Sequence, residues 1–166
     1  MIQFYRLLSY LLLPVAILFS FFALAMLVMA LGNLAALLPL FLVAATVIYI
    51  ITSFMFMQRG VLGGQPLKHS LRDWVKVNAY VALFFAISSL SQTVAFLGNP
   101  QLLEQVLDQA KGMVATMQQA NPGVKMPDMA TVMKGVLWLM AIISTVLLAH
   151  IFMGLTLLRR YANLFV

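Results

Sequence analysis

The chain contains no cysteine and very few charged residues. Among its 166 residues, 10 are Lys or Arg and 4 are Asp or Glu, while 64% are hydrophobic. Without cysteine the chain cannot form disulfides, zinc–thiolate sites or thiol redox centres. Only 8% of its residues are charged, whereas a water-soluble domain carries about a quarter. The shortage of charge, together with the high hydrophobic content, excludes a soluble globular fold and indicates an integral membrane protein.

Four long apolar segments take the place of the missing charges. They cover residues 10–31, 34–57, 77–97 and 135–158. Each is long enough to cross a hydrocarbon core of ~30 Å, and none shows the alternating ~10-residue pattern of a barrel strand. The first segment leads directly into the second, which favours a retained anchor over a cleavable signal peptide. We therefore predict an all-α, integral membrane four-helix bundle that forms a single membrane domain over residues 1–166.

Basic residues are divided unequally between the two ends of such a bundle. One end would carry Arg6, Arg59, Lys68, Arg72, Lys76, Arg159 and Arg160, and the other Lys111, Lys125 and Lys134. The positive-inside rule then predicts that both termini and the 58–76 connection are cytoplasmic and that the 99–134 segment is outside. This pattern is typical of a small multi-pass protein of a bacterial inner membrane. Because anionic lipid headgroups pair with such flanking charges, nucleic acid is not expected as a partner.

The connections between the segments carry turn and interface signals. Gly32-Asn33 is the one plausible turn between the first two spans, and it predicts a tight antiparallel hairpin. In the cytoplasmic connection, Ser70 and Asp73 have the spacing of a capping box, which predicts a helix start near Leu71. Four residues around this start are candidate contacts for lipid headgroups or for a partner: Lys68, Arg72, Trp74 and Lys76. Trp and basic residues are ordinary interface anchors, so lipid is the simpler interpretation.

The outer segment contains a predicted amphipathic helix at about residues 101–119. Apolar residues recur there at intervals of three and four, from Leu102 and Leu103 to Met117. Such a helix can lie on the outer leaflet, pair as a short coiled coil or offer a groove to a partner. We favour the first, because an interfacial helix of this length needs no partner.

The spans contain no Asp or Glu, and His150 is their only histidine. His150 and Tyr49 lie at equal depth, eight residues from the ends of their spans, so the two side chains can hydrogen-bond inside the bundle. This contact can be a structural tie between helices or part of a proton relay or substrate path. The tie is the simpler hypothesis, because a neutral imidazole satisfied by a hydroxyl needs no further role.

Small polar residues form a second intramembrane set, and its members are Ser88, Ser89, Gln92 and Ser144. They are candidate polar contacts between the third and fourth spans. Hydrogen bonding between packed helices explains them most simply, and the lining of a polar cavity is the alternative. Gln92 is the strongest candidate for a cavity, since a buried amide is hard to satisfy by accident.

Nothing in the sequence indicates catalysis. We expect no catalytic, cofactor-binding or metal-binding residues and no cofactor; the outer methionines from Met113 to Met133 fit flexible packing better than copper binding. The sequence favours a non-catalytic structural, accessory or interaction protein in contact with the lipid bilayer and with a membrane protein partner or a second copy. The alternative is a small homo-oligomeric channel or carrier with a polar path through spans three and four.

Overall fold

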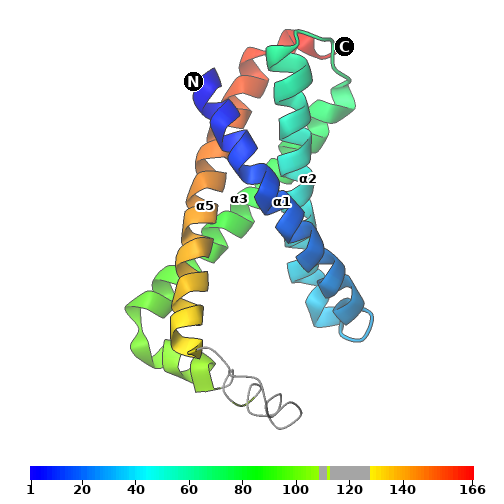
Figure 1. Ribbon diagram of the computed structural model, residues 1–166. Helices are drawn as coiled ribbons and strands as arrows, with labels where there is room; N and C mark the ends of the chain where they lie inside the picture. Colours follow the sequence, from blue (N-terminus) through cyan, green and yellow to red (C-terminus); the bar gives the residue numbers. More distant parts are fainter. Residues whose placement is uncertain (109–111, 113–127) are drawn as a thin grey trace. The chain divides into compact units, whose positions relative to one another are not determined.

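The part of the chain that the structure describes contains four long α-helices (Figure 1). The computed structural model describes residues 1–108, 112 and 128–166. Its long helices are α1 (Ile2–Ala30), α2 (Leu37–Met55), α3 (His69–Gly98) and α5 (Met129–Arg160). A 3-10 helix, η1 (Leu34–Ala36), precedes α2, a π-helix, η2 (Phe56–Leu62), extends it, and η3 (Ala162–Leu164) follows α5. All four helical segments are long and apolar enough to span a bilayer, so this is a multi-pass membrane protein.

The described chain divides into two compact units. The first contains Met1–Ile87 and Thr145–Val166, and the second contains Ser88–Ser144. In the first unit, α1 and α2 pack with the first part of α3 and the last part of α5 around one apolar core. The predicted all-α four-helix bundle is therefore confirmed.

Three of the four long helices, α1, α3 and α5, extend beyond the apolar spans from which they were predicted. α1 begins at Ile2 rather than near Tyr10, because polar residues at a helix end keep helical hydrogen bonds even where the apolar run has stopped. The Leu71 amide donates to the Lys68 carbonyl at 3.0 Å, so α3 begins at His69 rather than at Leu71. Most of the predicted 58–76 connection is therefore helical, because η2 extends to Leu62 and α3 already begins at His69. Only residues 63–68 lie between these two helices.

The turn between α1 and α2 is formed as predicted by Gly32 and Asn33. The Asn33 side chain accepts a hydrogen bond from the Ala35 amide at 3.0 Å, which starts η1. Such a short connection leaves α1 and α2 no alternative to packing as antiparallel neighbours. Pro14 lies inside α1 without ending the helix.

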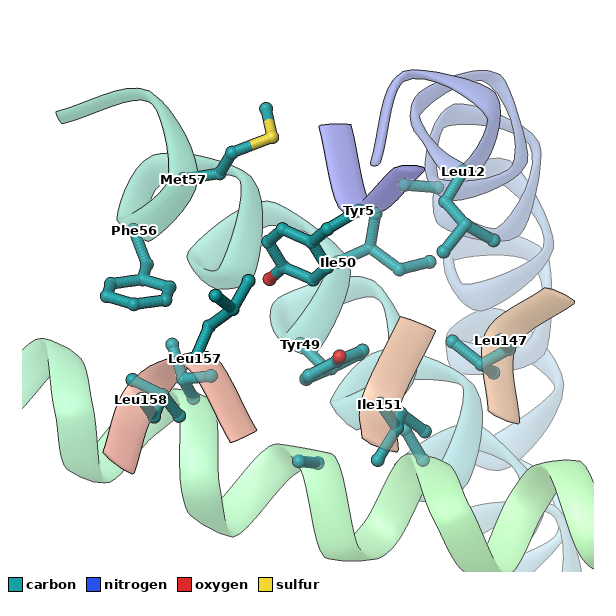
Figure 2. Close-up of a cluster of buried hydrophobic side chains, with 14 of the residues drawn as sticks. Tyr5, Leu12, Tyr49, Ile50, Phe56, Met57, Leu147, Ile151, Leu157 and Leu158 are labelled. Carbon is teal, nitrogen blue, oxygen red and sulfur yellow. The ribbon is translucent and has the colours of Figure 1, made fainter. Parts of the chain in front are cut away.

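The core of the first unit combines large apolar side chains with alanines. Ala79, Ala82 and Ala86 of α3 are fully buried, which lets neighbouring backbones come close. Figure 2 shows the large members of the cluster, among them Leu12, Ile50 and Ile151. On the outside, apolar side chains such as Phe21 and Val28 of α1 are exposed. This is the reverse of a soluble protein and fits a surface that faces lipid acyl chains.

The end of the chain folds back onto the connection between η2 and α3. The Leu67 amide donates to the Leu164 carbonyl at 2.7 Å, and the Val166 amide donates to the Leu67 carbonyl at 2.9 Å. Between these two bonds, Phe165 is buried and stacks on Phe56 with ring centroids 5.8 Å apart. The connection is thus braced by backbone hydrogen bonds and by an aromatic contact.

The second unit contains two side-chain helix caps, one at Asn99 and one at Asp128. The Asn99 side chain accepts hydrogen bonds from the amides of Gln101 and Leu102, and residues 100–108 are helical. These are the first turns of the helix predicted at 101–119; of its later residues only 112 is among those described, so its amphipathic character remains a prediction. Before α5, Asp128 accepts from the Thr131 hydroxyl at 2.6 Å, and this bond, with those from the Ala130 and Thr131 amides, holds the Asp128 pKa below its ordinary value.

Candidate functional site

His150 lies at the centre of a buried polar cluster in the first unit. Its Nε2 is 2.8 Å from the Ser9 hydroxyl, and its Nδ1 is 2.8 Å from the Tyr49 hydroxyl. The Tyr5 ring stacks on the imidazole with centroids 4.5 Å apart and planes 14° apart. Tyr49 meets the same imidazole edge-on, at 5.5 Å and 74°. One residue of α5 therefore joins side chains of α1 and α2.

The hydrogen bonds of the cluster determine where its protons lie. The Ser9 hydroxyl donates its single hydrogen to the Tyr5 carbonyl at 2.8 Å. It must therefore accept a hydrogen from Nε2 of His150, which makes Nδ1 of a neutral imidazole the acceptor for the Tyr49 hydroxyl. This tautomer is assigned from the hydrogen-bond geometry. Both ring nitrogens are thus occupied by groups of the protein itself.

Helical spacing explains how the sequence builds this cluster. Tyr5 and Ser9 on α1, Tyr49 and Ser53 on α2, and His150 and Gly154 on α5 form three pairs, each four residues apart. Residues at this spacing lie on one face of a helix, one turn apart. All six are buried. Three helix faces of the same height therefore meet around the imidazole.

Gly154 allows the two tyrosine hydroxyls to approach the backbone of α5. A Cβ atom at this position would lie 3.1 Å from the Tyr49 hydroxyl and 3.3 Å from the Tyr5 hydroxyl. Both distances are shorter than ordinary van der Waals contact, so a Cβ atom here would require the two hydroxyls to shift by a few tenths of an ångström. Glycine at this position allows the close approach without such a shift.

The Tyr5 hydroxyl makes no hydrogen bond of full geometry in the cluster. It is buried, and among the residues that the structure describes the Ser53 hydroxyl interacts with it more weakly. Its ring is held by stacking on His150 and belongs to the same buried apolar cluster as Ile50 and Leu157, which Figure 2 shows. The cluster is closed on all sides by protein, with Tyr5 and His150 each 0% exposed.

Of the residues predicted from the sequence, Tyr49 and His150 are brought together, whereas Tyr5, Ser9, Ser53 and Gly154 were not predicted. Tyr5 and Ser9 were missed because the first span was placed at residues 10–31, which excludes both. Two sequence signals could have identified them: they are four residues apart, and they lie at the same end of the predicted bundle as His150. Gly154 could have been found as the glycine one turn after His150.

The four polar residues predicted to join spans three and four all lie in the second unit; they are Ser88, Ser89, Gln92 and Ser144. Ser144 is fully buried, and its hydroxyl has no hydrogen-bond partner among the described residues. Ser88 and Ser89 are half-buried, and the Ser89 carbonyl accepts from the Thr93 hydroxyl at 2.9 Å. Gln92, expected to be a buried amide, is exposed on α3. Around Gln92, hydropathy does not distinguish the face of α3 that packs inward from the face that is exposed.

The four residues expected at the cytoplasmic interface take different positions. Lys68 and Trp74 line a groove between α2 and α3, together with Arg59. Arg72 is half-buried and points its guanidinium at the Phe165 ring, 5.9 Å from the ring centroid. Lys76 is half-buried one turn further along α3. These side chains therefore do not all belong to one surface.

Within the described residues, no three His, Asp or Glu side chains come close enough together to hold a metal ion. No protein-family model matches the chain, and comparisons with curated proteins and with solved structures found no match. The side chains of the site are therefore the basis for any functional conclusion.

Proposed function

We propose that this protein is a non-catalytic structural, accessory or interaction protein of a bacterial inner membrane. The observation that carries the proposal is the state of His150, the one histidine inside the apolar spans predicted from the sequence. Both of its nitrogens hydrogen-bond to hydroxyls of other helices, and its side chain is 0% exposed. A general base or proton carrier needs a nitrogen within reach of its substrate. An imidazole committed on both sides instead ties three helices together.

The contact surfaces of such a protein would lie outside the bundle core. The outer segment, with its predicted amphipathic helix at 101–119, is longer than a connection between α3 and α5 requires. We propose that this helix lies on the outer leaflet and that it there contacts a membrane protein partner or a second copy.

Replacing residues 101–119 by a Gly-Ser linker of equal length is expected to remove the partner or change the assembly. The measurement is native mass spectrometry of the protein, expressed in its own host and extracted with its surrounding lipid. The control exchanges the same residues for an unrelated amphipathic helix with the same apolar spacing. If the linker variant kept the same subunits and the same mass as the wild type, the proposal would be wrong.

The proposed orientation has both termini in the cytoplasm, supported by seven basic residues at that end against three in the outer segment. Because the chain has no cysteine, single cysteines can report the sidedness. Asn163→Cys and Gln105→Cys both replace exposed residues. In intact cells, a membrane-impermeant maleimide is expected to label the cysteine at 105 but not the one at 163, which reacts only after lysis. The opposite labelling would reverse the topology.

A homo-oligomeric channel or carrier is the second candidate, and exposed Gln92 favours it. An amide that faces lipid leaves its donors unpaired, which is costly in hydrocarbon. A second copy that covers Gln92 would remove this cost. Native mass spectrometry would then give a homo-oligomer, and Gln92→Leu would reduce flux through proteoliposomes. Flux that Gln92→Leu leaves unchanged would remove Gln92 from the path.

A further inference from the structure

A groove runs between α2 and α3 in the first unit and consists of two adjoining hollows. One has a volume of about 630 Å³ and the other of about 590 Å³, and both are lined by Ile48, Ser70 and Trp74. Volumes of this size are typical of sites for small molecules. We call the two hollows together the α2–α3 groove.

The two hollows differ in charge. The first is lined by Arg59 and Lys68, and no acidic side chain is among its lining residues. The second is lined by apolar side chains such as Phe41, Ala45 and Val81, with Asp73 as its one charged group. An anionic group is therefore attracted to the Arg59–Lys68 end and repelled from the Asp73 hollow. The groove as a whole is basic at one end and mainly apolar at the other.

The basic end is held in place by the connection behind it. The Gln65 amide donates to the Arg59 carbonyl at 3.0 Å, and the Gly64 amide donates to the Gly60 carbonyl at 2.9 Å. Leu67, another lining residue, is paired with Leu164 and Val166. The backbone that carries Arg59, Gln65 and Lys68 is thus ordered by its own hydrogen bonds, without a ligand.

The lining of the groove matches the two parts of a phospholipid. On α3 its lining residues extend from Ser70 to Val81, eleven residues along the chain, which is about 16 Å at the helical rise of 1.5 Å per residue. The hydrocarbon of one leaflet is half of a ~30 Å core, so an acyl chain can lie along this stretch of α3. A basic end beside an apolar hollow is the arrangement that an anionic headgroup joined to an acyl chain requires.

We propose that the α2–α3 groove binds an anionic phospholipid. Its phosphate lies at the Arg59–Lys68 end, and an acyl chain lies along the apolar hollow between Phe41 and Val81. Trp74, which lines both hollows and is 55% exposed, lies beside the bound lipid. This site is independent of the partner surface proposed for the outer segment.

Trp74 supplies a direct probe of the site. The chain has two tryptophans, and Trp138→Phe leaves Trp74 as the single fluorophore. In phosphatidylcholine vesicles, Trp74 emission is titrated with phosphatidylglycerol brominated on its acyl chains and, separately, with equally brominated phosphatidylcholine. We expect phosphatidylglycerol to associate about fivefold more strongly, the preference that roughly one basic side chain gives at an anionic headgroup.

Charge variants distinguish lipid binding in the groove from the general attraction of anionic lipid to the basic surface. Arg59→Gln with Lys68→Gln is expected to reduce the preference to about onefold, whereas Arg159→Gln with Arg160→Gln is expected to leave it near fivefold. Ala44→Phe, which partly fills the apolar hollow, is expected to weaken quenching by both lipids. Equal losses in the two double variants would mean diffuse attraction and would overturn the proposal. No preference in the wild type, or no quenching of Trp74 by either lipid, would overturn it too.

Discussion

Replacing Gly154 by valine is expected to destabilise the bundle by about 3 kcal/mol. The new Cβ atom alone would lie 3.1 Å from the Tyr49 hydroxyl and 3.3 Å from the Tyr5 hydroxyl, and the two methyl groups of valine add further overlap. Overpacking of this kind costs about 1–3 kcal/mol, and a displaced Tyr49 that leaves Nδ1 of His150 unpaired adds about 1–3 kcal/mol. The measurement is reversible unfolding by sodium dodecyl sulfate in mixed micelles, followed by near-UV circular dichroism.

Gly135→Val is the matched control on the same helix. Among the described residues, no atom outside the neighbouring backbone of the helix lies within 4 Å of a Cβ atom built at Gly135, and the change in helix propensity is the same at both positions. The control is therefore expected to shift the unfolding free energy by less than about 0.5 kcal/mol. If Gly154→Val and Gly135→Val lowered the free energy of unfolding equally, the close packing of the tyrosine hydroxyls against Gly154 would not contribute to stability.

Replacing His150 by phenylalanine is expected to cost about 2 kcal/mol of unfolding free energy. The phenyl ring can keep the stacking on Tyr5, but it removes the acceptor of the Tyr49 hydroxyl and the donor to Ser9. The buried Tyr49 hydroxyl is then left without its partner. The same unfolding assay measures the loss.

A double-mutant cycle with Tyr49→Phe tests whether the hydrogen bond itself carries this effect. Removing both partners of a buried hydrogen bond costs less than removing one, so we expect the double variant to regain about 1 kcal/mol relative to additive losses. Tyr80→Phe serves as the control, because Tyr80 is 61% exposed. The changes in unfolding free energy caused by Tyr80→Phe and His150→Phe are expected to be additive. A cycle in which Tyr49→Phe is also additive would show that the two side chains do not act together.

The two variants address different properties of one cluster. Gly154→Val tests the space in which the tyrosine hydroxyls meet α5, and His150→Phe tests the hydrogen bonds that join α5 to α1 and α2. A partner-binding or lipid-binding defect in either variant would indicate that the surfaces outside the bundle depend on the cluster.

The class of the protein follows from composition and from residue order. Long uncharged runs permit a helix in a bilayer and little else, because every backbone amide and carbonyl in hydrocarbon needs a partner within its own segment. The turn at Gly32-Asn33 is likewise predicted from the sequence, because these two residues are the one break between two long apolar runs. The sequence also predicts the depth match between Tyr49 and His150, because helical rise converts distance along the chain into depth.

Sequence patterns were less informative about which face of each helix packs inward. In water, polar residues mark the outer face of a helix, but here apolar side chains occupy both faces, so periodicity says little about orientation. For this reason Gln92 was expected to be buried and is exposed, and Tyr5 and Ser9 were overlooked although they complete the His150 cluster.

The amino-acid order is thus enough to establish an all-α membrane bundle, the approximate depth of its polar residues and the short turn between its first two helices. The tertiary structure alone places Gly154 against two tyrosine hydroxyls, folds Phe165 back onto Phe56 and opens a groove between α2 and α3. Each of these contacts joins residues far apart in the chain. Their formation depends on how helices rotate and approach one another, and side-chain packing rather than hydropathy decides this.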